Sequence, residues 1–357
     1  MIEVTNLRKT FYVHKKAPGL RASFRSLFHR EKTAKHAVKG ATFRVEEGEI
    51  LGLIGANGAG KTTLVKMLSG IIHPTSGDAR VLGHVPWERS NELRRQVALI
   101  MGQKAQLWWD LPAADCFLLL RDIYQLPEQE YRTSLDKLSS MLGVKDVLNV
   151  QIRRLSLGER MKMELIAALL HSPRVLYLDE PTIGLDLTAQ KAVRDFILEY
   201  RSQRAPAMIL TSHYMEDIER LCKRIIIIRE GEIVYDGGLR TVVEQYATEK
   251  TVTAHLKKNG ELAVAKPEVA RLGTVAECNA VCVKLRVPRD RVAEAAQALL
   301  HHYEVADITI EEPEIGQIIE QIMTARGGSD AGGPGAPESL GAPSIAGSSA
   351  ENEEEGS

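Results

Sequence analysis

Short apolar runs of the kind found in β-strands alternate with helical patterns along residues 1–238. The runs "EILGLIG", "RVLYLDE" and "AMILTSH" are each followed by a segment with a helical pattern. Strands that are apolar along their whole length are typical of a parallel sheet buried between helices. Two other stretches, "ATFRVEEGEI" and "RIIIIREGEIVYDG", predict hairpins that turn at Glu-Gly. The pattern therefore indicates an α/β fold with a parallel sheet and a smaller antiparallel sheet beside it.

The remainder of the chain has a different pattern. Residues 239–326 predict a small α+β unit that ends in the helix "EIGQIIEQIM". Residues 327–357 are rich in Gly, Pro and Ser, hold six acids and no Lys or Arg, and contain Leu340 and Ile345 as their only large aliphatic residues. Such a segment cannot bury enough apolar surface to offset the entropy of ordering, so we expect a disordered tail.

A glycine-rich stretch, "GANGAGKTT", follows the first apolar run and precedes the helical pattern "TLVKMLSG". It fits GxxxxGK(S/T) in the strand–loop–helix context that this pattern requires. Backbone N–H groups and the helix N-terminus would surround phosphates, Lys61 would reach the β- and γ-phosphates, and Thr62 would bind Mg²⁺. This predicted phosphate loop comprises Gly55, Ala56, Asn57, Gly58, Ala59, Gly60, Lys61, Thr62 and Thr63.

A second apolar run, "RVLYLDEP", ends in two adjacent carboxylates. A buried strand at this place would deliver Asp179 to the Mg²⁺ ion. Glu180, one residue further on, would lie near the γ-phosphate and polarise the attacking water. An apolar strand ending in Asp-Glu is common by itself, but it is a strong indication in combination with the phosphate loop.

The order of "GANGAGKT", "MGQ", "LSLGE", "VLYLDEPTIGLD" and "TSH" over residues 2–238 resembles the nucleotide-binding subunit of ABC transporters. The resemblance implies a P-loop ATPase core with a parallel sheet, an antiparallel β subdomain and a helical subdomain at 104–160. It also implies ATP and Mg²⁺ as cofactors. Its implied site residues are Phe11 or Tyr12 stacking on adenine, Gln103 sensing Mg²⁺ and the membrane partner, Asp186 in the loop that communicates across a dimer, and His213 contacting the γ-phosphate.

The stretch "LSLGE" (155–159) departs from the family's usual LSGGQ at Leu157 and Glu159. In this family, the signature loop of one subunit closes over ATP bound to the other. That contact needs the hydroxyl of Ser156 and backbone N–H groups near Gly158 at a helix N-terminus, and both residues are present. Glu159 puts an acid in the first helical turn, which the helix dipole favours, but it removes an amide that could contact the nucleotide. Because Lys61, Glu180 and His213 are intact as well, we expect an active ATPase and not a degenerate one.

The chain has one phosphate loop and one signature loop. An ATP site built from the phosphate loop of one subunit and the signature loop of another therefore needs two chains. A second copy or a paralogous ATPase would supply the other half, and separate multi-span membrane subunits would complete a transporter. The basic insertion at 14–36 and the C-terminal unit resemble features of exporter ATPases. Trp108 and Trp109 are candidate contacts for the membrane subunit, with core packing as the alternative.

Composition narrows the function further. A net charge of −1 makes nucleic acid an unexpected partner. No apolar run approaches the roughly 20 residues that span a bilayer, and the start lacks a secretory signal, so we expect a protein kept in the cytosol. The resemblance to ABC transporter subunits implies that it lies peripherally at the cytoplasmic face of the membrane. A soluble ABC ATPase of translation or DNA repair is the alternative, although such proteins usually carry two cassettes or a long coiled coil.

The insertion at 14–36 holds seven Lys or Arg residues and one acid. Its apolar residues fall on one face of a predicted helix, at Leu20, Phe24, Leu27 and Phe28. The helix would lie against anionic lipid or the membrane subunit, with a solvated surface helix as the alternative.

Overall fold

The computed structural model describes residues 1–14, 32–102, 104–246, 248–257, 267–313 and 315–324. Gln103, most of the basic insertion (15–31) and the tail 327–357 lie outside these ranges, so what the sequence predicts for them stays a prediction. Across the described ranges, no helix has both the length and the apolar character needed to cross a membrane.

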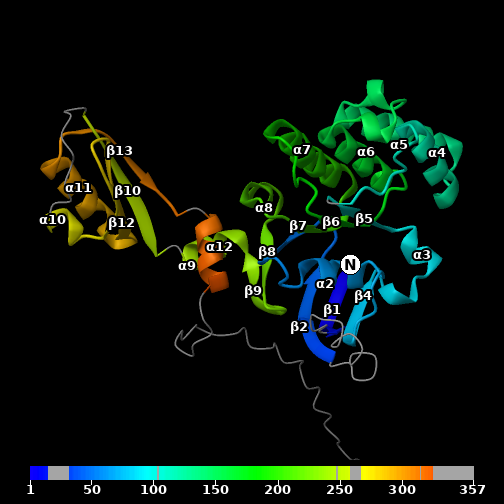
Figure 1. Cartoon of the computed structure of the whole chain (residues 1–357), viewed down its shortest axis with the longest axis horizontal. Coiled ribbons are helices and arrows are strands. Elements are labelled where there is room, and N and C mark those ends of the chain that lie inside the picture. Colours follow the sequence, from blue (N-terminus) through cyan, green and yellow to red (C-terminus); the bar gives the residue numbers. More distant parts are fainter. Residues whose placement is uncertain (15–31, 103, 247, 258–266, 314, 325–357) are drawn as a thin grey trace, which may run out of the picture. The chain divides into compact units, whose positions relative to one another are not determined.

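A six-stranded sheet organises the first 238 residues (Figure 1). In spatial order its strands are β5 (Val97–Met101), β6 (Val175–Asp179), β7 (Ala207–Thr211), β3 (Ile50–Ile54), β8 (Arg224–Arg229) and β9 (Glu232–Gly238). All neighbours are parallel except β8 and β9. Every residue of β3, β6 and β7 is buried, which confirms the three apolar runs as strands of a parallel sheet.

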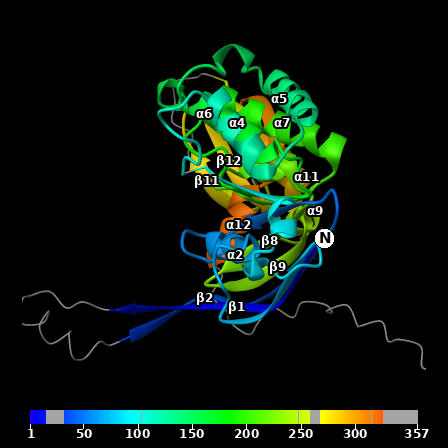
Figure 2. The ribbon, with the colours of Figure 1, turned by 90° about the vertical axis from the view of Figure 1, so that its right-hand side faces the viewer.

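A second, antiparallel sheet has three strands: β2 (Lys32–Val45), β1 (Ile2–His14) and β4 (Ser76–Val81), in that order. Figure 2 shows β1 and β2 as a long ribbon. The expected hairpin at 41–50 is wrong, because β2 belongs to this sheet whereas β3 belongs to the six-stranded one. Buried and exposed residues alternate at the end of β2, as in a strand with one buried face, whereas β3 is buried on both faces. The predicted hairpin at 224–237 is present as β8 and β9, but it forms the edge of the parallel sheet.

Helices follow the strands in the manner that the sequence predicts. Their N-terminal set comprises α2 (Lys61–Leu68), α3 (Asn91–Arg94), α4 (Ala113–Tyr124), α5 (Glu128–Leu142), α6 (Leu157–Leu169), α7 (Leu187–Arg204) and α8 (Met215–Leu221). Short 3₁₀ turns occur at Pro86–Glu88, Lys145–Val147 and Ile152–Arg154. Figure 1 places α4 to α7 on one side of the six-stranded sheet and α2 on the other.

The six-stranded sheet separates two hydrophobic cores. Ile50 and Ile54 of β3 face the core built with α4 to α7, whereas Leu51 and Leu53 face the core shared with α2 and the antiparallel sheet. Successive side chains of a strand point to opposite faces, so a continuous apolar run fills both cores at once. The two cores hold the carboxyl ends of β3, β6 and β7 in fixed positions.

The C-terminal region contains a four-stranded antiparallel sheet with a core of its own. Its strands lie in the order β11 (Thr274–Cys278), β12 (Cys282–Pro288), β10 (Glu249–Leu256) and β13 (Val305–Glu311). This sheet packs against α11 (Val292–His302), and α10 (Pro267–Ala270) and a 3₁₀ turn at Arg289–Arg291 complete the unit. Two flanking helices, α9 (Leu239–Tyr246) and α12 (Ile315–Thr324), contribute buried residues to the core of α4 to α7 instead.

Candidate active site

The phosphate loop connects the buried strand β3 to the N-terminus of α2. Gly60 adopts a φ of 116° at the N-cap of α2, and a Cβ atom there would lie 2.3 Å from the carbonyl oxygen of Ala37. Only glycine fits both the backbone conformation and this close approach. Among the described residues no side chain caps the helix, which leaves its first N–H groups able to bind an anion.

Lys61 is the first residue of α2, and its side chain turns back into the phosphate loop. Its ammonium donates to the carbonyl oxygens of Gly55, at 2.6 Å, and Ala56, at 3.2 Å. Burial lowers the pKa of Lys61, and the nearby Glu180 and Asp179 carboxylates partly oppose this shift. A cation therefore lies where the loop would hold phosphate.

Asp179 and Thr62 lie together although 117 positions separate them in the chain. Asp179 Oδ1 accepts hydrogen bonds from Thr62 Oγ1, at 3.2 Å, and from Thr211 Oγ1, at 2.6 Å. A carboxylate and a hydroxyl are the hard oxygen donors that suit Mg²⁺. Their position at the base of the phosphate loop fits the metal site that the sequence predicts.

Glu180 and His213 form a close pair. His213 Nε2 lies 2.8 Å from Glu180 Oε1. Glu180 has a φ of 58°, which is unusual for a residue other than glycine, and its backbone N–H donates to the carbonyl oxygen of Thr211. A Cβ atom at Gly102 would lie 1.9 Å from the carbonyl oxygen of Glu180, so the residue directly after β5 must be glycine. The backbone is held in an uncommon conformation at a carboxylate suited to act as a base.

A pocket of about 580 Å³ lies between the phosphate loop and the part of the β1–β2 ribbon where β1 ends and β2 begins. The residues that line it include Phe11, Tyr12, Lys61, Thr62, Thr63 and Glu180. Lys35 also lines the pocket, opposite Phe11 in the register of β1 and β2, and the sequence did not single it out as a site residue. The only feature of the sequence that could have indicated Lys35 was its position at the edge of the basic insertion. The Phe11 ring is 36% exposed and carries the Lys9 ammonium 5.2 Å from its centroid.

Ser156, Gly158 and Asp186 do not line this pocket. Ser156 is the N-cap of α6 and Asp186 is the N-cap of α7, where its carboxylate accepts a hydrogen bond from Ala189 N–H at 2.9 Å. A Cβ atom at Gly158 would lie 3.0 Å from the Cβ of Ala189, so the two helix starts approach each other closely. The structure thus divides the predicted site residues into two separate groups within one chain.

A buried polar cluster that the sequence did not indicate lies behind the Glu180–His213 pair. Asp217 on α8 is fully buried and accepts hydrogen bonds from Thr182 and from Ser212, the latter at 2.6 Å. It also bonds the buried guanidinium of Arg194 at 3.2 Å. Thr182 follows Glu180 by two residues and Ser212 precedes His213, so one carboxylate joins the two loops that carry the pair. Asp217 and Arg194 lie outside the recognised motifs, and a charged residue on a helix gives no sign in a single sequence that it will be buried.

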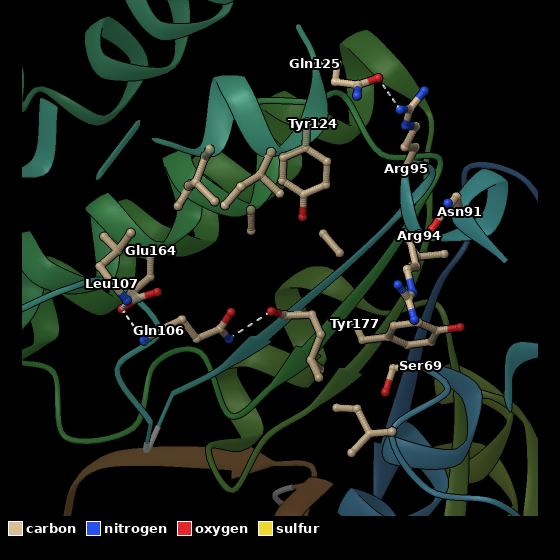
Figure 3. A pocket seen from close by; sticks show the side chains of 18 of the residues that line it. Ser69, Asn91, Arg94, Arg95, Gln106, Leu107, Tyr124, Gln125, Glu164 and Tyr177 are labelled. Atoms are coloured by element: carbon tan, nitrogen blue, oxygen red, sulfur yellow. Dashed lines mark hydrogen bonds between the residues drawn. The ribbon is translucent and has the colours of Figure 1, made fainter. Parts of the chain in front are cut away.

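Another cavity, of about 610 Å³, lies between the helical region and the sheet (Figure 3). Arg94 and Arg95 form part of its wall, and Ile71, Trp108 and Ile123 contribute apolar surface. Trp108 and Trp109 are 45% and 49% exposed, so the alternative that they pack in the core is wrong. Trp109 stacks under the guanidinium of Arg160, 5.1 Å from the ring centroid.

Glu164 on α6 anchors the loop at one wall of this cavity. Its Oε1 atom accepts hydrogen bonds from the backbone N–H groups of Gln106, at 2.8 Å, and Leu107, at 3.1 Å, as Figure 3 shows for Gln106. Burial raises the pKa of Glu164, and the two backbone bonds partly oppose this shift. The bonds attach the segment after Gln103 to the helix that begins at the signature loop.

The geometry of Glu164 predicts the pH dependence of a matched pair of variants. Because its folded pKa lies above its unfolded one, ionisation of Glu164 destabilises the folded state increasingly as pH rises through that interval. Glu164→Gln keeps the accepting oxygen without the charge, so we expect its melting temperature at pH 7 to equal or exceed that of the wild type. This advantage should vanish below the ordinary glutamate pKa of about 4.3.

Glu164→Ala is the contrasting variant, because it leaves both N–H groups without an acceptor and should cost about 2 kcal/mol or more. Thermal unfolding of the three proteins from pH 4 to 8 measures these differences. A Gln variant as unstable as the Ala variant would contradict an anchoring role for the oxygen.

Comparisons with known proteins agree with this geometry. The sequence model of the family described as ABC transporter matches residues 38–183, and that of the EvrA-like ABC transporter, C-terminal domain matches residues 248–311. The ABC transporter ATP-binding protein NatA of Bacillus subtilis is 30% identical over 222 residues, which are 62% of this chain and 90% of that protein. The Nod factor export ATP-binding protein I of Burkholderia thailandensis is 36% identical over 210 residues, 59% of this chain and 68% of that protein. A solved ATP-binding subunit of an ABC transporter superposes with a TM-score of 0.58 at 26% identity, covering 69% of this chain and 93% of that one.

Proposed function

This chain belongs to the family of ABC transporter ATP-binding proteins, and from that premise we propose that it hydrolyses ATP to drive an exporter whose membrane subunits are separate chains. One observation carries the proposal. The side chains of Lys61, Asp179, Glu180 and His213 come from three distant segments and meet at the carboxyl ends of β3, β6 and β7. Ligands bind at this edge of open parallel sheets.

The roles of these residues follow from their positions. Lys61 and the N-terminus of α2 would bind the β- and γ-phosphates, while the ring of Phe11 or Tyr12 would stack on adenine. Thr62 and Asp179 would hold Mg²⁺, which neutralises charge on the phosphates when it is bound. Glu180 would accept a proton from the attacking water, and His213 would hold the Glu180 carboxylate in place and contact the γ-phosphate.

A second chain would complete the site. Ser156 and Gly158 lie outside the pocket of their own phosphate loop, at a helix N-terminus suited to phosphate. A second copy of the chain would bring its signature loop over the bound ATP. A homodimer is the simplest arrangement, because one chain supplies both halves.

The cavity of Figure 3 is the surface we propose for the membrane subunit. It combines exposed apolar side chains, Trp108 and Ile123, with the cationic Arg94 and Arg95. A short cytoplasmic helix of the membrane subunit would place its apolar face on Trp108 and Ile123. Its C-terminal carbonyl groups, or an acidic side chain, would contact the two arginines. The chain would then lie at the cytoplasmic face of the membrane, and the Nod factor export relative supports export as the direction.

Co-purification from detergent-solubilised membranes tests this function. We expect a tagged chain to retain multi-span membrane subunits, identified by mass spectrometry, and Ile123→Arg to lose them while keeping its ATPase activity. Val281→Arg is the matched control, since Val281 is similarly exposed but belongs to the β11–β12 turn. Recovery of ribosomal or DNA-repair proteins instead of membrane subunits would support the soluble alternative.

A further inference from the structure

The signature loop is closed on itself by Glu159. Ser156 donates hydrogen bonds from its backbone N–H, at 2.8 Å, and from its hydroxyl, at 2.7 Å, to the same carboxylate oxygen of Glu159. In return, the backbone N–H of Glu159 donates to Ser156 Oγ at 3.3 Å. This reciprocal arrangement is a capping box at the start of α6. Ser156 is exposed and Glu159 is partly exposed, so a second subunit can reach both side chains.

The Ser156 hydroxyl has a single proton to donate. In the proposed dimer, the hydroxyl would donate its hydrogen bond to a phosphate oxygen of ATP on the other subunit. The Glu159 carboxylate already accepts that hydrogen bond, so the carboxylate and the phosphate compete for the same donor. Closure over ATP must therefore break the 2.7 Å bond between the hydroxyl and the carboxylate.

Charge adds to this competition. The hydrogen bonds from Ser156 lower the pKa of Glu159, with a smaller contribution from Lys162, so the carboxylate is ionised at neutral pH. It lies in the first turn of α6, where the dipole favours an anion. ATP phosphates approaching the same helix end would meet a like charge, and the positive potential available to them would be reduced.

We propose that Glu159 is a positioning residue that restrains ATP-driven closure, because it holds the Ser156 hydroxyl and places a negative charge at the phosphate-binding end of α6. The proposal rests on the dimer of the proposed function. Glu159 sets the ATP concentration at which two chains close, without contacting the ATP bound to its own subunit. A purely structural helix cap would have no such effect.

Glu159→Gln separates the two roles. Glutamine at this position also forms a capping box, so the start of α6 is kept while the charge is removed. A neutral side chain competes more weakly for the hydroxyl and does not repel phosphate. We expect closure to need roughly ten-fold less ATP, on the scale of one close charge pair near a protein surface.

The measurement is the monomer–dimer distribution by light scattering during ATP titration. It is made in a Glu180→Gln background, which slows hydrolysis, and compared with Glu159→Gln added. Glu130→Gln, an equal charge change in the first turn of α5, is the control and should leave the midpoint unchanged. ATP affinity of the monomer, measured at low protein concentration, should be the same in all three proteins. The shift should shrink as NaCl is raised, since salt screens a charge that is partly exposed to solvent.

An ATP-dependent dimer with the same midpoint in both proteins would overturn the role of Glu159 and leave the proposed function standing. A shift that does not change with salt would also overturn the charge mechanism. Absence of any ATP-dependent dimer would instead overturn the dimer of the proposed function, and this inference with it.

Discussion

Glu180→Gln is expected to slow ATP hydrolysis by about 10²–10⁴-fold, the usual contribution of a positioned general base, while ATP still binds. The carboxamide has nearly the same shape as the carboxylate but cannot accept the proton of the attacking water. His213 lies 2.8 Å from the carboxylate and Gly102 fits closely against the Glu180 carbonyl, so the backbone that places the side chain should remain unchanged. Phosphate release at saturating ATP, together with ATP affinity by calorimetry, measures the two effects separately.

Glu88→Gln is a suitable control, because Glu88 is exposed and lies on the 3₁₀ turn Pro86–Glu88 outside the pocket. Its turnover should match the wild type. The same Glu180 variant should also accumulate as an ATP-bound dimer. Turnover close to normal in Glu180→Gln would remove this residue from the role of base.

Asp217→Ala should destabilise the folded chain by about 3–5 kcal/mol, the usual cost of removing one partner of a buried ion pair. Asp217 is fully buried, and its loss would leave the Arg194 guanidinium, with a side chain only 2% exposed, without its buried counter-charge. The hydroxyls of Thr182 and Ser212 would lose their acceptor as well. Because these hydroxyls belong to the loops of Glu180 and His213, we expect ATPase activity to fall even at temperatures where the variant stays folded.

Urea unfolding monitored by circular dichroism gives the change in free energy. Glu216→Gln is the matched control, since Glu216 bonds the same Arg194 at 3.0 Å but is 53% exposed and should contribute no more than about 1 kcal/mol. If Asp217→Ala cost as little as Glu216→Gln, the exposed carboxylate would be the one that balances Arg194.

The strands β3, β6 and β7 and the phosphate loop follow from the sequence alone. Each is a contiguous stretch whose pattern has one physical explanation: an apolar run is buried on both faces, and glycines before Lys61 allow a turn around phosphate. The capping box of Ser156 and Glu159 is also local, since both residues lie within one helical turn. The sequence indicated Glu159 as an acid favoured by the helix dipole, and only the structure showed that it bonds Ser156.

Contacts between distant segments depended on the tertiary structure. The sequence assigned 41–50 to one hairpin, because a turn signal does not say which sheet the next strand joins. The structure shows that β2 pairs with β1 and not with β3. In the structure, Trp108 and Trp109 are exposed although tryptophan is mostly buried in proteins. The Arg194–Asp217 pair is buried although charged residues are mostly exposed. A local pattern determines which segment becomes a strand, a helix or a phosphate loop, because backbone geometry and burial act over a few residues. Which side chains meet is decided by packing across the whole fold, because those contacts join residues that are far apart in the chain.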